Sequence, residues 1–161
     1  MKAKGTVHKF GDNVDTDVII PARYLNKSDE AWLASHCMED IDKDFVKNVK
    51  PGDIIVANKN FGCGSSREQA PSVLKALGIK AVIAKSFARI FYRNSINIGL
   101  PVIVCKDLYE HVEDGGQADL DLSAGTVTVD GQVFSCTKLP EYMQNILNAG
   151  GLIASLNKEE A

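Results

Sequence analysis

The sequence has little of what a nucleic-acid-binding or membrane-spanning protein needs. Its 161 residues contain 18 Lys and Arg against 21 Asp and Glu, so the formal net charge is −3. Surfaces that bind phosphate backbones normally carry a basic excess, so we expect no nucleic-acid partner. No apolar run has the length that a bilayer requires, and residues 1–5 lead into no signal-peptide core. We therefore expect a cytoplasmic protein with no membrane partner.

The sequence also lacks the cysteine spacing of metal sites. Its four cysteines are scattered and form no Cys-x-x-Cys pair: Cys37, Cys63, Cys105 and Cys136. Neither a zinc site nor a complete iron–sulfur ligand set follows from such spacing, so we expect no metal and no cofactor in this chain. The thiols are expected to be reduced. Cys63 differs because it precedes a predicted helix start, where a thiol can have a lowered pKa and be sensitive to oxidation.

Common nucleotide-binding and hydrolase motifs are absent as well. The pattern Gly62-x-Gly64-x-x-Arg67 lacks the third glycine of a dinucleotide fingerprint, and no Gly-Lys-Ser or Gly-Lys-Thr follows to make a P-loop. There is no Gly-x-Ser-x-Gly elbow, which disfavours a serine hydrolase. The chain is long enough to bury a full core without metal or disulfides, so we expect one domain spanning residues 1–161.

The most informative stretch is residues 60–71, which read NFGCGSSREQAP. It lies between a predicted buried strand at 54–57 and a predicted helix whose first turn carries Ser65, Ser66 and Arg67. The unpaired amides at a helix start favour an anion, and the Arg67 guanidinium is a planar fork suited to a carboxylate or phosphate. We interpret the stretch as a carboxylate-binding, catalytic loop.

Glycine gives the backbone of this loop its freedom. Gly62 and Gly64, which flank Cys63, permit positive φ and let a ligand approach the main chain closely. A simpler interpretation stays open, because Ser65 followed by Glu68 is a capping box, and this pattern begins many helices that have no active site.

The order of the predicted elements indicates an α/β fold. Buried strands are predicted at 54–57, 79–85 and 100–104. The helices between them end at Gly78 and Gly99, and the second one starts at Ser86. Strands and helices that alternate at this spacing form parallel βαβ units.

The two ends of the chain have other patterns. Near the N-terminus we expect a strand at 5–10 and a turn that enters a short strand within 14–21. In the last third, strands are predicted at 117–122, 126–129 and 132–136, with Asp130-Gly131 as a hairpin turn and a terminal helix at 139–147. Ser28 or Asp29 is predicted to cap an early helix. The loop before that helix is either plain surface or a recognition loop: Arg23, Tyr24, Leu25, Asn26 and Lys27.

Three motifs in one order carry a resemblance to a known family. They are residues 11–21 (GDNVDTDVIIP), 60–68 (NFGCGSSRE) and 85–90 (KSFARI). Together they resemble the aconitase superfamily and, more narrowly, the small-subunit family of 3-isopropylmalate dehydratases. The resemblance covers nearly the whole chain. It implies a swivelling β/β/α domain with a parallel strand core, flanking helices and an additional C-terminal β hairpin.

The resemblance also implies a function shared between two subunits. A separate large subunit would carry a [4Fe-4S] cluster, and the small subunit would be active only with it. The implied hydro-lyase reaction converts 2-isopropylmalate to 3-isopropylmalate by dehydration and rehydration, a step of leucine biosynthesis. By resemblance, Ser65 is the catalytic base, Ser66 holds a substrate oxygen or supports Ser65, and Arg67 clamps a substrate carboxylate.

The loop from Arg23 to Lys27 corresponds, by resemblance, to the segment that contacts the variable side group of the substrate. In this chain Asn26 and Lys27 match neither the apolar nor the arginine pattern of the family. The related acids 2,3-dimethylmalate, homocitrate, homoaconitate and citrate therefore stay open as substrates. An alternative of another class is a non-catalytic, anion-binding regulatory domain that senses oxidation through Cys63.

Overall fold

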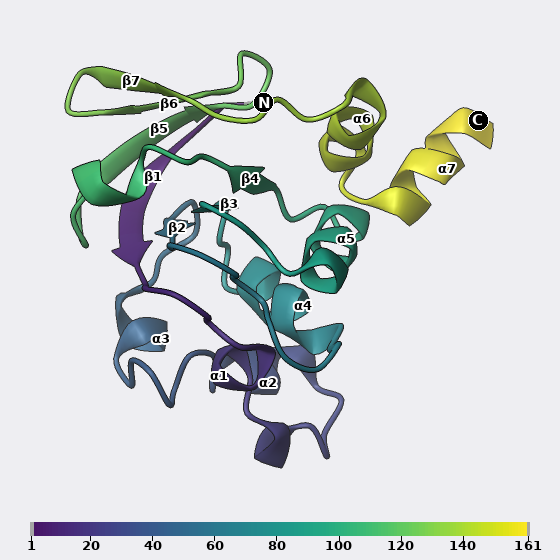
Figure 1. Ribbon diagram of the computed structural model, residues 1–161. Coiled ribbons are helices and arrows are strands. Elements are labelled where there is room, and N and C mark those ends of the chain that lie inside the picture. The colour runs from purple at the N-terminus through teal and green to yellow at the C-terminus, as the bar shows by residue number, and fades with distance from the viewer. Residues whose placement is uncertain (1, 161) are drawn as a thin grey trace.

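The computed structural model describes residues 2–160, with side chains for residues 2–157. Its strands are β1 (Lys2–Lys9), β2 (Ile54–Val56), β3 (Ala81–Ala84), β4 (Val102–Val104), β5 (Gln117–Asp121), β6 (Thr126–Val129) and β7 (Gln132–Ser135). They form one sheet in the order β4-β3-β2-β1-β5-β6-β7 (Figure 1). Strands β1 to β4 pair in parallel, and β5 to β7 are antiparallel.

Strand β1 joins the two parts of the sheet. The C-terminal half of β1 pairs with β2 in parallel, with Val7 opposite Ile54. Along the rest of its length β1 pairs with β5 in antiparallel fashion. At the far edge, Asp130 and Gly131 turn between β6 and β7 with φ of 51° and 78°, the left-handed pair of a two-residue hairpin. The predicted α/β class, with a parallel core and a C-terminal hairpin, is confirmed.

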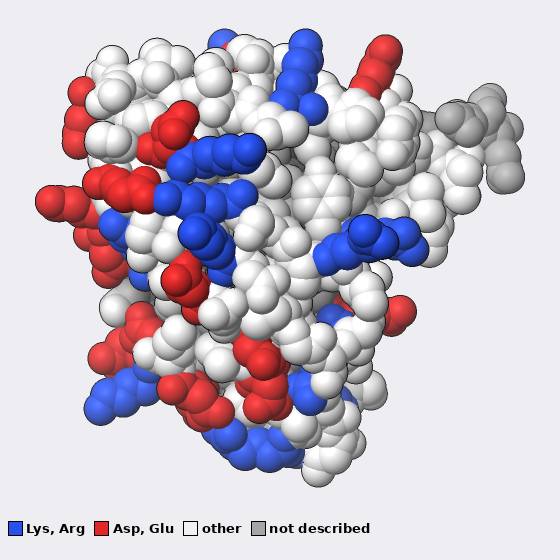
Figure 2. Space-filling view, viewed as in Figure 1, with Lys and Arg blue, Asp and Glu red and all other residues white. Residues whose placement is uncertain are grey.

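The helices are α1 (Thr16–Ile19), α2 (Glu30–Ala34), α3 (Phe45–Asn48), α4 (Gln69–Ala76), α5 (Arg89–Asn97), α6 (Glu141–Ala149) and α7 (Leu152–Glu160), with 3-10 turns η1 (Ala22–Tyr24) and η2 (Tyr109–His111). Figure 1 shows α1 and α2 at the end of the molecule opposite β5 to β7. Within the described residues, no helix has the length and apolar character to cross a membrane. On the face shown in Figure 2, acidic and basic side chains are intermixed.

The parallel strands form the centre of the core. Every residue of β2 and of β3 is buried. Helices cover parallel sheets on both faces, so their strands read as continuous apolar runs rather than alternating ones. This explains why 54–57 and 79–85 could be predicted from the sequence as buried strands.

The prediction of a short strand within 14–21 is wrong. The chain forms the one-turn helix α1 there, and the Asp15 side chain caps it by accepting a hydrogen bond from the backbone N–H of Asp17. Val18, Ile19 and Ile20 favour a strand by their branched side chains, but the cap and the tertiary contacts of this segment override that weak preference.

The predicted start of the helix after the glycine loop is also wrong. Helix α4 begins at Gln69, and its N-cap, Glu68, makes no side-chain capping bond, so the proposed capping box does not form. Pro71 gives the physical reason. It lies in the first turn of α4, where a missing N–H costs nothing, whereas a helix starting at Ser65 would press the proline ring against the carbonyl of Arg67.

Two further differences concern α5 and α7. Helix α5 begins at Arg89 rather than Ser86, because residues 86–88 are extended and pair with Phe61. Helix α7 was not predicted. It follows Gly150 and Gly151, both at positive φ, which end α6 and turn the chain. The early helix α2 is capped by Asp29, as one of the two predicted alternatives.

Candidate active site

The three sequence motifs form one structural unit. The backbone N–H of Gly62 donates to Val14 O at 2.7 Å, and the N–H of Thr16 donates to Cys63 O at 2.8 Å. On its other side, the N–H of Ala88 donates to Phe61 O at 3.0 Å. The glycine loop is thus held between the segment that enters α1 and the segment that enters α5.

Glycine is required at both loop positions. Gly62 has φ of +83°, and a Cβ atom there would lie 2.2 Å from Phe91 Cγ. Gly64 has φ of +89°, and its Cβ atom would lie 2.8 Å from Asp15 Oδ1. A side chain at either position would be strained by its backbone conformation and would also collide with a neighbour.

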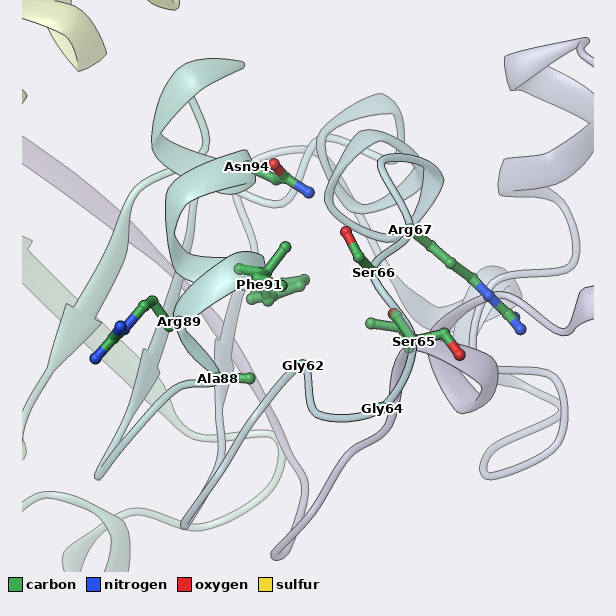
Figure 3. A pocket seen from close by; sticks show the side chains of 11 residues that line it. Gly62, Gly64, Ser65, Ser66, Arg67, Ala88, Arg89, Phe91 and Asn94 are labelled. Carbon is green, nitrogen blue, oxygen red and sulfur yellow. The ribbon is translucent and has the colours of Figure 1, made fainter.

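A cavity of about 370 Å³ opens between this loop and α5. It is lined by Thr16, Gly62, Gly64, Ser65, Ser66, Arg67, Ala88, Arg89, Ile90, Phe91 and Asn94. Figure 3 shows the Ser66 and Asn94 side chains pointing toward one another across it. The predicted site residues Ser65, Ser66, Arg67, Gly62 and Gly64 all line this one cavity, whereas Cys63 does not.

Sequence reasoning missed three polar residues of this cavity: Thr16, Arg89 and Asn94. A signal for two of them was available, because Thr16 lies inside the first motif and Arg89 inside the third. Asn94 follows one helical turn beyond that motif, on the face of α5 that points at the loop (Figure 3).

The backbone amides of the loop provide the hydrogen-bond donors for an anion that the start of the helix was expected to provide. The backbone N–H groups of residues 64–67 donate to no acceptor in the part of the chain that the structure describes. Because α4 begins only at Gln69, these four groups belong to the loop that lines the cavity and not to the first turn of the helix. Consecutive unpaired amides at a turn form a concave site that favours negative charge.

Arg67 lies at the rim of the cavity. Its Nη1 donates to Asp17 Oδ1 at 2.8 Å and to Ile20 O at 3.3 Å. Figure 3 shows the side chain extending away from Asn94. The hydrogen bond from Arg67 is the main cause that lowers the pKa of the Asp17 carboxyl.

The loop from Arg23 to Lys27 does not line the cavity. Arg23 is held by Asp40, with Nη2 and Oδ1 2.6 Å apart, and the hydroxyl of Tyr24 donates to Glu39. Lys27 lies over the Trp32 ring, 4.6 Å from its centroid. The loop nevertheless joins the site through its start, because the N–H of Ala22 donates to Asp17 Oδ1 at 2.9 Å.

The expectation of a lowered pKa at Cys63 is wrong. Partial burial raises the pKa of this thiol, and the nearby Asp15 carboxylate raises it further. The helix that was expected to stabilise the thiolate starts six residues later, at Gln69. The oxidation-sensing alternative loses its physical basis, since a thiol with a raised pKa reacts slowly.

Metal ligands do not gather in the region whose side chains are described. Among those residues, no group of three or more His, Cys, Asp or Glu side chains is arranged to hold a metal ion. The cavity itself is lined by hydroxyl, guanidinium, amide and apolar groups. This donor set suits a carboxylic acid and not an iron–sulfur cluster.

Comparison with known proteins identifies the family. The family model of the aconitase C-terminal domain matches residues 1–107. The 3-isopropylmalate dehydratase small subunit of Lachnoclostridium phytofermentans is 58% identical over 161 residues, which cover 99% of this chain and 98% of that protein. The chain belongs to the small-subunit family of 3-isopropylmalate dehydratases, within the aconitase superfamily.

Two other members of this small-subunit family bear on fold and substrate. The crystal structure of 3-isopropylmalate dehydratase from Methanocaldococcus jannaschii superposes with a TM-score of 0.94 at 51% identity, covering 99% of this chain and 96% of that chain. The 2,3-dimethylmalate dehydratase small subunit of Eubacterium barkeri is 57% identical over 162 residues, or 99% of each chain. The 3-isopropylmalate dehydratase small subunit of Helicobacter hepaticus is also 57% identical, so sequence identity does not distinguish the two substrates.

Proposed function

We propose that this chain is the small subunit of a hydro-lyase that isomerises 2-isopropylmalate to 3-isopropylmalate, with Ser65 as the catalytic base. The observation that carries the proposal is the loop of residues 62–67, which brings two serines to one cavity and has four amides with no acceptor among the described residues. A large subunit completes the site and carries a [4Fe-4S] cluster. The chain alone is inactive.

Each residue of the loop has a chemical task. Ser65, as an alkoxide, takes the proton from the carbon next to a substrate carboxylate and returns a proton in the rehydration step. The free loop amides stabilise the negative charge on Ser65 and on the dianionic carboxylate that forms. Ser66, which faces Asn94, holds a substrate oxygen, and Arg67 clamps a carboxylate. When bound, the cluster supplies a Lewis-acidic iron that favours departure of the hydroxyl group.

The loop from Arg23 to Lys27, which we call the selectivity loop, has contacts that support an alkyl side group on the substrate. Citrate and homoaconitate carry an added carboxylate, which would need a free cation on this loop. Both of its cations are engaged, Arg23 by Asp40 and Lys27 by the Trp32 ring. Leu25 packs partly buried against the core. These contacts favour 2-isopropylmalate or 2,3-dimethylmalate over the tricarboxylic acids.

A reconstituted complex tests the catalytic assignment. The chain, mixed under anaerobic conditions with a large subunit of the family, is expected to generate enoate absorbance from 2-isopropylmalate. Ser65→Ala is expected to remove this activity while the complex still forms on size-exclusion chromatography. Ser72→Ala is the matched control, because that hydroxyl bonds Glu30 outside the cavity. Full turnover by the Ser65→Ala complex would overturn the assignment of the base.

A panel of acids tests the substrate. We expect the highest kcat/KM with 2-isopropylmalate, a lower one with 2,3-dimethylmalate, and little turnover of citrate or homocitrate. A clear preference for 2,3-dimethylmalate would move the chain to that activity. A preference for a tricarboxylic acid would contradict the argument from the engaged cations.

A further inference from the structure

We infer that Asp17 is a positioning residue that couples the carboxylate clamp to the selectivity loop. One oxygen, Asp17 Oδ1, accepts from Arg67 Nη1 at 2.8 Å and from the backbone N–H of Ala22 at 2.9 Å. Arg67 is the proposed clamp, and Ala22 is the first residue of η1, which opens the loop toward Lys27. This inference rests on the proposed function and assigns a further residue to it.

The contact leaves Arg67 able to bind substrate. Nη1 makes both contacts that the structure gives to this guanidinium, to Asp17 and to Ile20 O. The Nε–Nη2 edge, which presents two parallel N–H groups, keeps its donors free within the described residues. That edge is the one suited to bidentate binding of a carboxylate. Asp17 therefore holds Arg67 through Nη1 and leaves the Nε–Nη2 edge for a carboxylate.

Of the two side chains in this ion pair, Arg67 is the more buried. The side chain of Arg67 is 18% exposed, whereas that of Asp17 is 57% exposed. The guanidinium is enclosed and needs a specific acceptor to hold its orientation, because losing one would leave a covered charge without its partner. The charge of Arg23 also lowers the pKa of Asp17, as a smaller cause than the hydrogen bonds from Arg67 and Ala22.

The second contact ties the loop to the same oxygen. The N–H of Ala22 is at the start of η1, where a helical turn has no internal acceptor for its amide. Asp17 supplies that acceptor, so the start of the loop cannot shift without disturbing the contact to Arg67. The candidate substrates share a carboxylate that would bind Arg67. When this carboxylate binds, the selectivity loop is already held in position through Asp17.

Two substitutions separate the two contacts. Asp17→Asn keeps an Oδ1 acceptor for Ala22 but removes the charge that holds Arg67. Asp17→Ala removes both. The substrates are 2-isopropylmalate and its smaller analogue 2-methylmalate, which share both carboxylates and the hydroxyl and differ only in the alkyl group. Steady-state kinetics are measured with the reconstituted complex, and complex formation is checked for each variant.

Asp17→Asn is expected to raise KM for both acids by the same factor, about tenfold, with kcat changed less than about twofold, because binding to the common carboxylate is uniform. Asp17→Ala is expected to change, in addition, the ratio of kcat/KM between the two acids. The control is Glu110→Gln, which removes the charge paired with Lys85; neither residue lines the cavity, and the Glu110 side chain is 55% exposed, close to the 57% of Asp17. It is expected to leave both KM values and the ratio unchanged.

The outcomes distinguish this inference from the proposed function. Wild-type complex that turns over none of the acids of the panel overturns both. Active wild type together with an unchanged KM in Asp17→Asn overturns the clamp contact alone. An unchanged ratio in folded Asp17→Ala overturns the coupling to the loop. Equal effects from Glu110→Gln and Asp17→Asn would show a general effect of surface charge and would likewise overturn the inference.

Discussion

The hydroxyl of Thr16 donates a 2.7 Å hydrogen bond to the carbonyl oxygen of Ser65, 49 residues away in the sequence. Thr16 is 2% exposed and lines the cavity. The bond holds the backbone of the proposed base, while Ser65 itself is exposed. The first and second motifs of the sequence are therefore joined at the residue that we propose as the base.

Thr16→Val is expected to lower both stability and activity. Valine has the shape of threonine but no hydroxyl, so the Ser65 carbonyl loses a donor at a cost of about 1 kcal/mol in the free energy of unfolding. Because the loop then moves relative to the substrate, kcat/KM is expected to fall about tenfold. Urea unfolding and the enoate assay measure the two effects. Thr16→Ser, which keeps the hydroxyl, is expected to retain most of the activity; equal losses in both variants would contradict the role of this bond.

Gly62→Ala is expected to destabilise the fold strongly. Its positive φ alone costs a side chain about 1–2 kcal/mol. The added Cβ would also lie 2.2 Å from Phe91 Cγ, which adds about 1–3 kcal/mol for overpacking. Gly115→Ala is the matched control, since Gly115 has φ of +86° and open space around the built Cβ. Urea unfolding should show the larger loss for Gly62→Ala; equal losses would mean that α5 moves aside freely.

Acid is expected to remove the stabilising effect of Asp17. The pKa of its carboxyl is lowered in the folded chain, chiefly by the hydrogen bond from Arg67. A lowered folded pKa means that the pair stabilises the fold above the ordinary carboxyl pKa of about 4, and that this contribution is lost as the pH falls through the folded pKa. Wild type should therefore be more stable than Asp17→Asn at pH 7. The difference should shrink below about pH 4, and a difference independent of pH would contradict the assignment.

Cys63 is expected to be a slow nucleophile. Burial and the Asp15 carboxylate raise the pKa of its thiol, so little thiolate is present at neutral pH. Alkylation by iodoacetamide, followed by mass spectrometry of the peptide that contains Cys63, should be slower at pH 7.5 than alkylation of a free peptide thiol. The rate should rise at a higher pH than that of the free peptide thiol, because the pKa of Cys63 is raised. Fast alkylation at neutral pH would restore the oxidation-sensing hypothesis.

The sequence by itself determined the parallel core, the hairpin and which residues form the loop that lines the cavity. Continuous apolar runs specify strands buried on both faces, as at Ile54–Val56, and Asp130-Gly131 specifies a two-residue turn through its positive φ. These are local properties, because they depend on neighbours in the chain. The grouping of Ser65, Ser66 and Arg67 is local for the same reason.

Only the tertiary structure decided which partner Arg67 contacts and in which direction the pKa of Cys63 is shifted. Arg67 turns to Asp17, 50 residues earlier, and Cys63 acquires the field of Asp15. Secondary-structure propensity and motif spacing cannot predict such partners, because hydrogen bonds and charge interactions depend on distance in space and not on distance along the chain. The start of α4 depends on both the sequence and the tertiary structure. Pro71 is the local signal for this start. The contacts of residues 62–65 with residues 14–16 keep the preceding loop out of the helix.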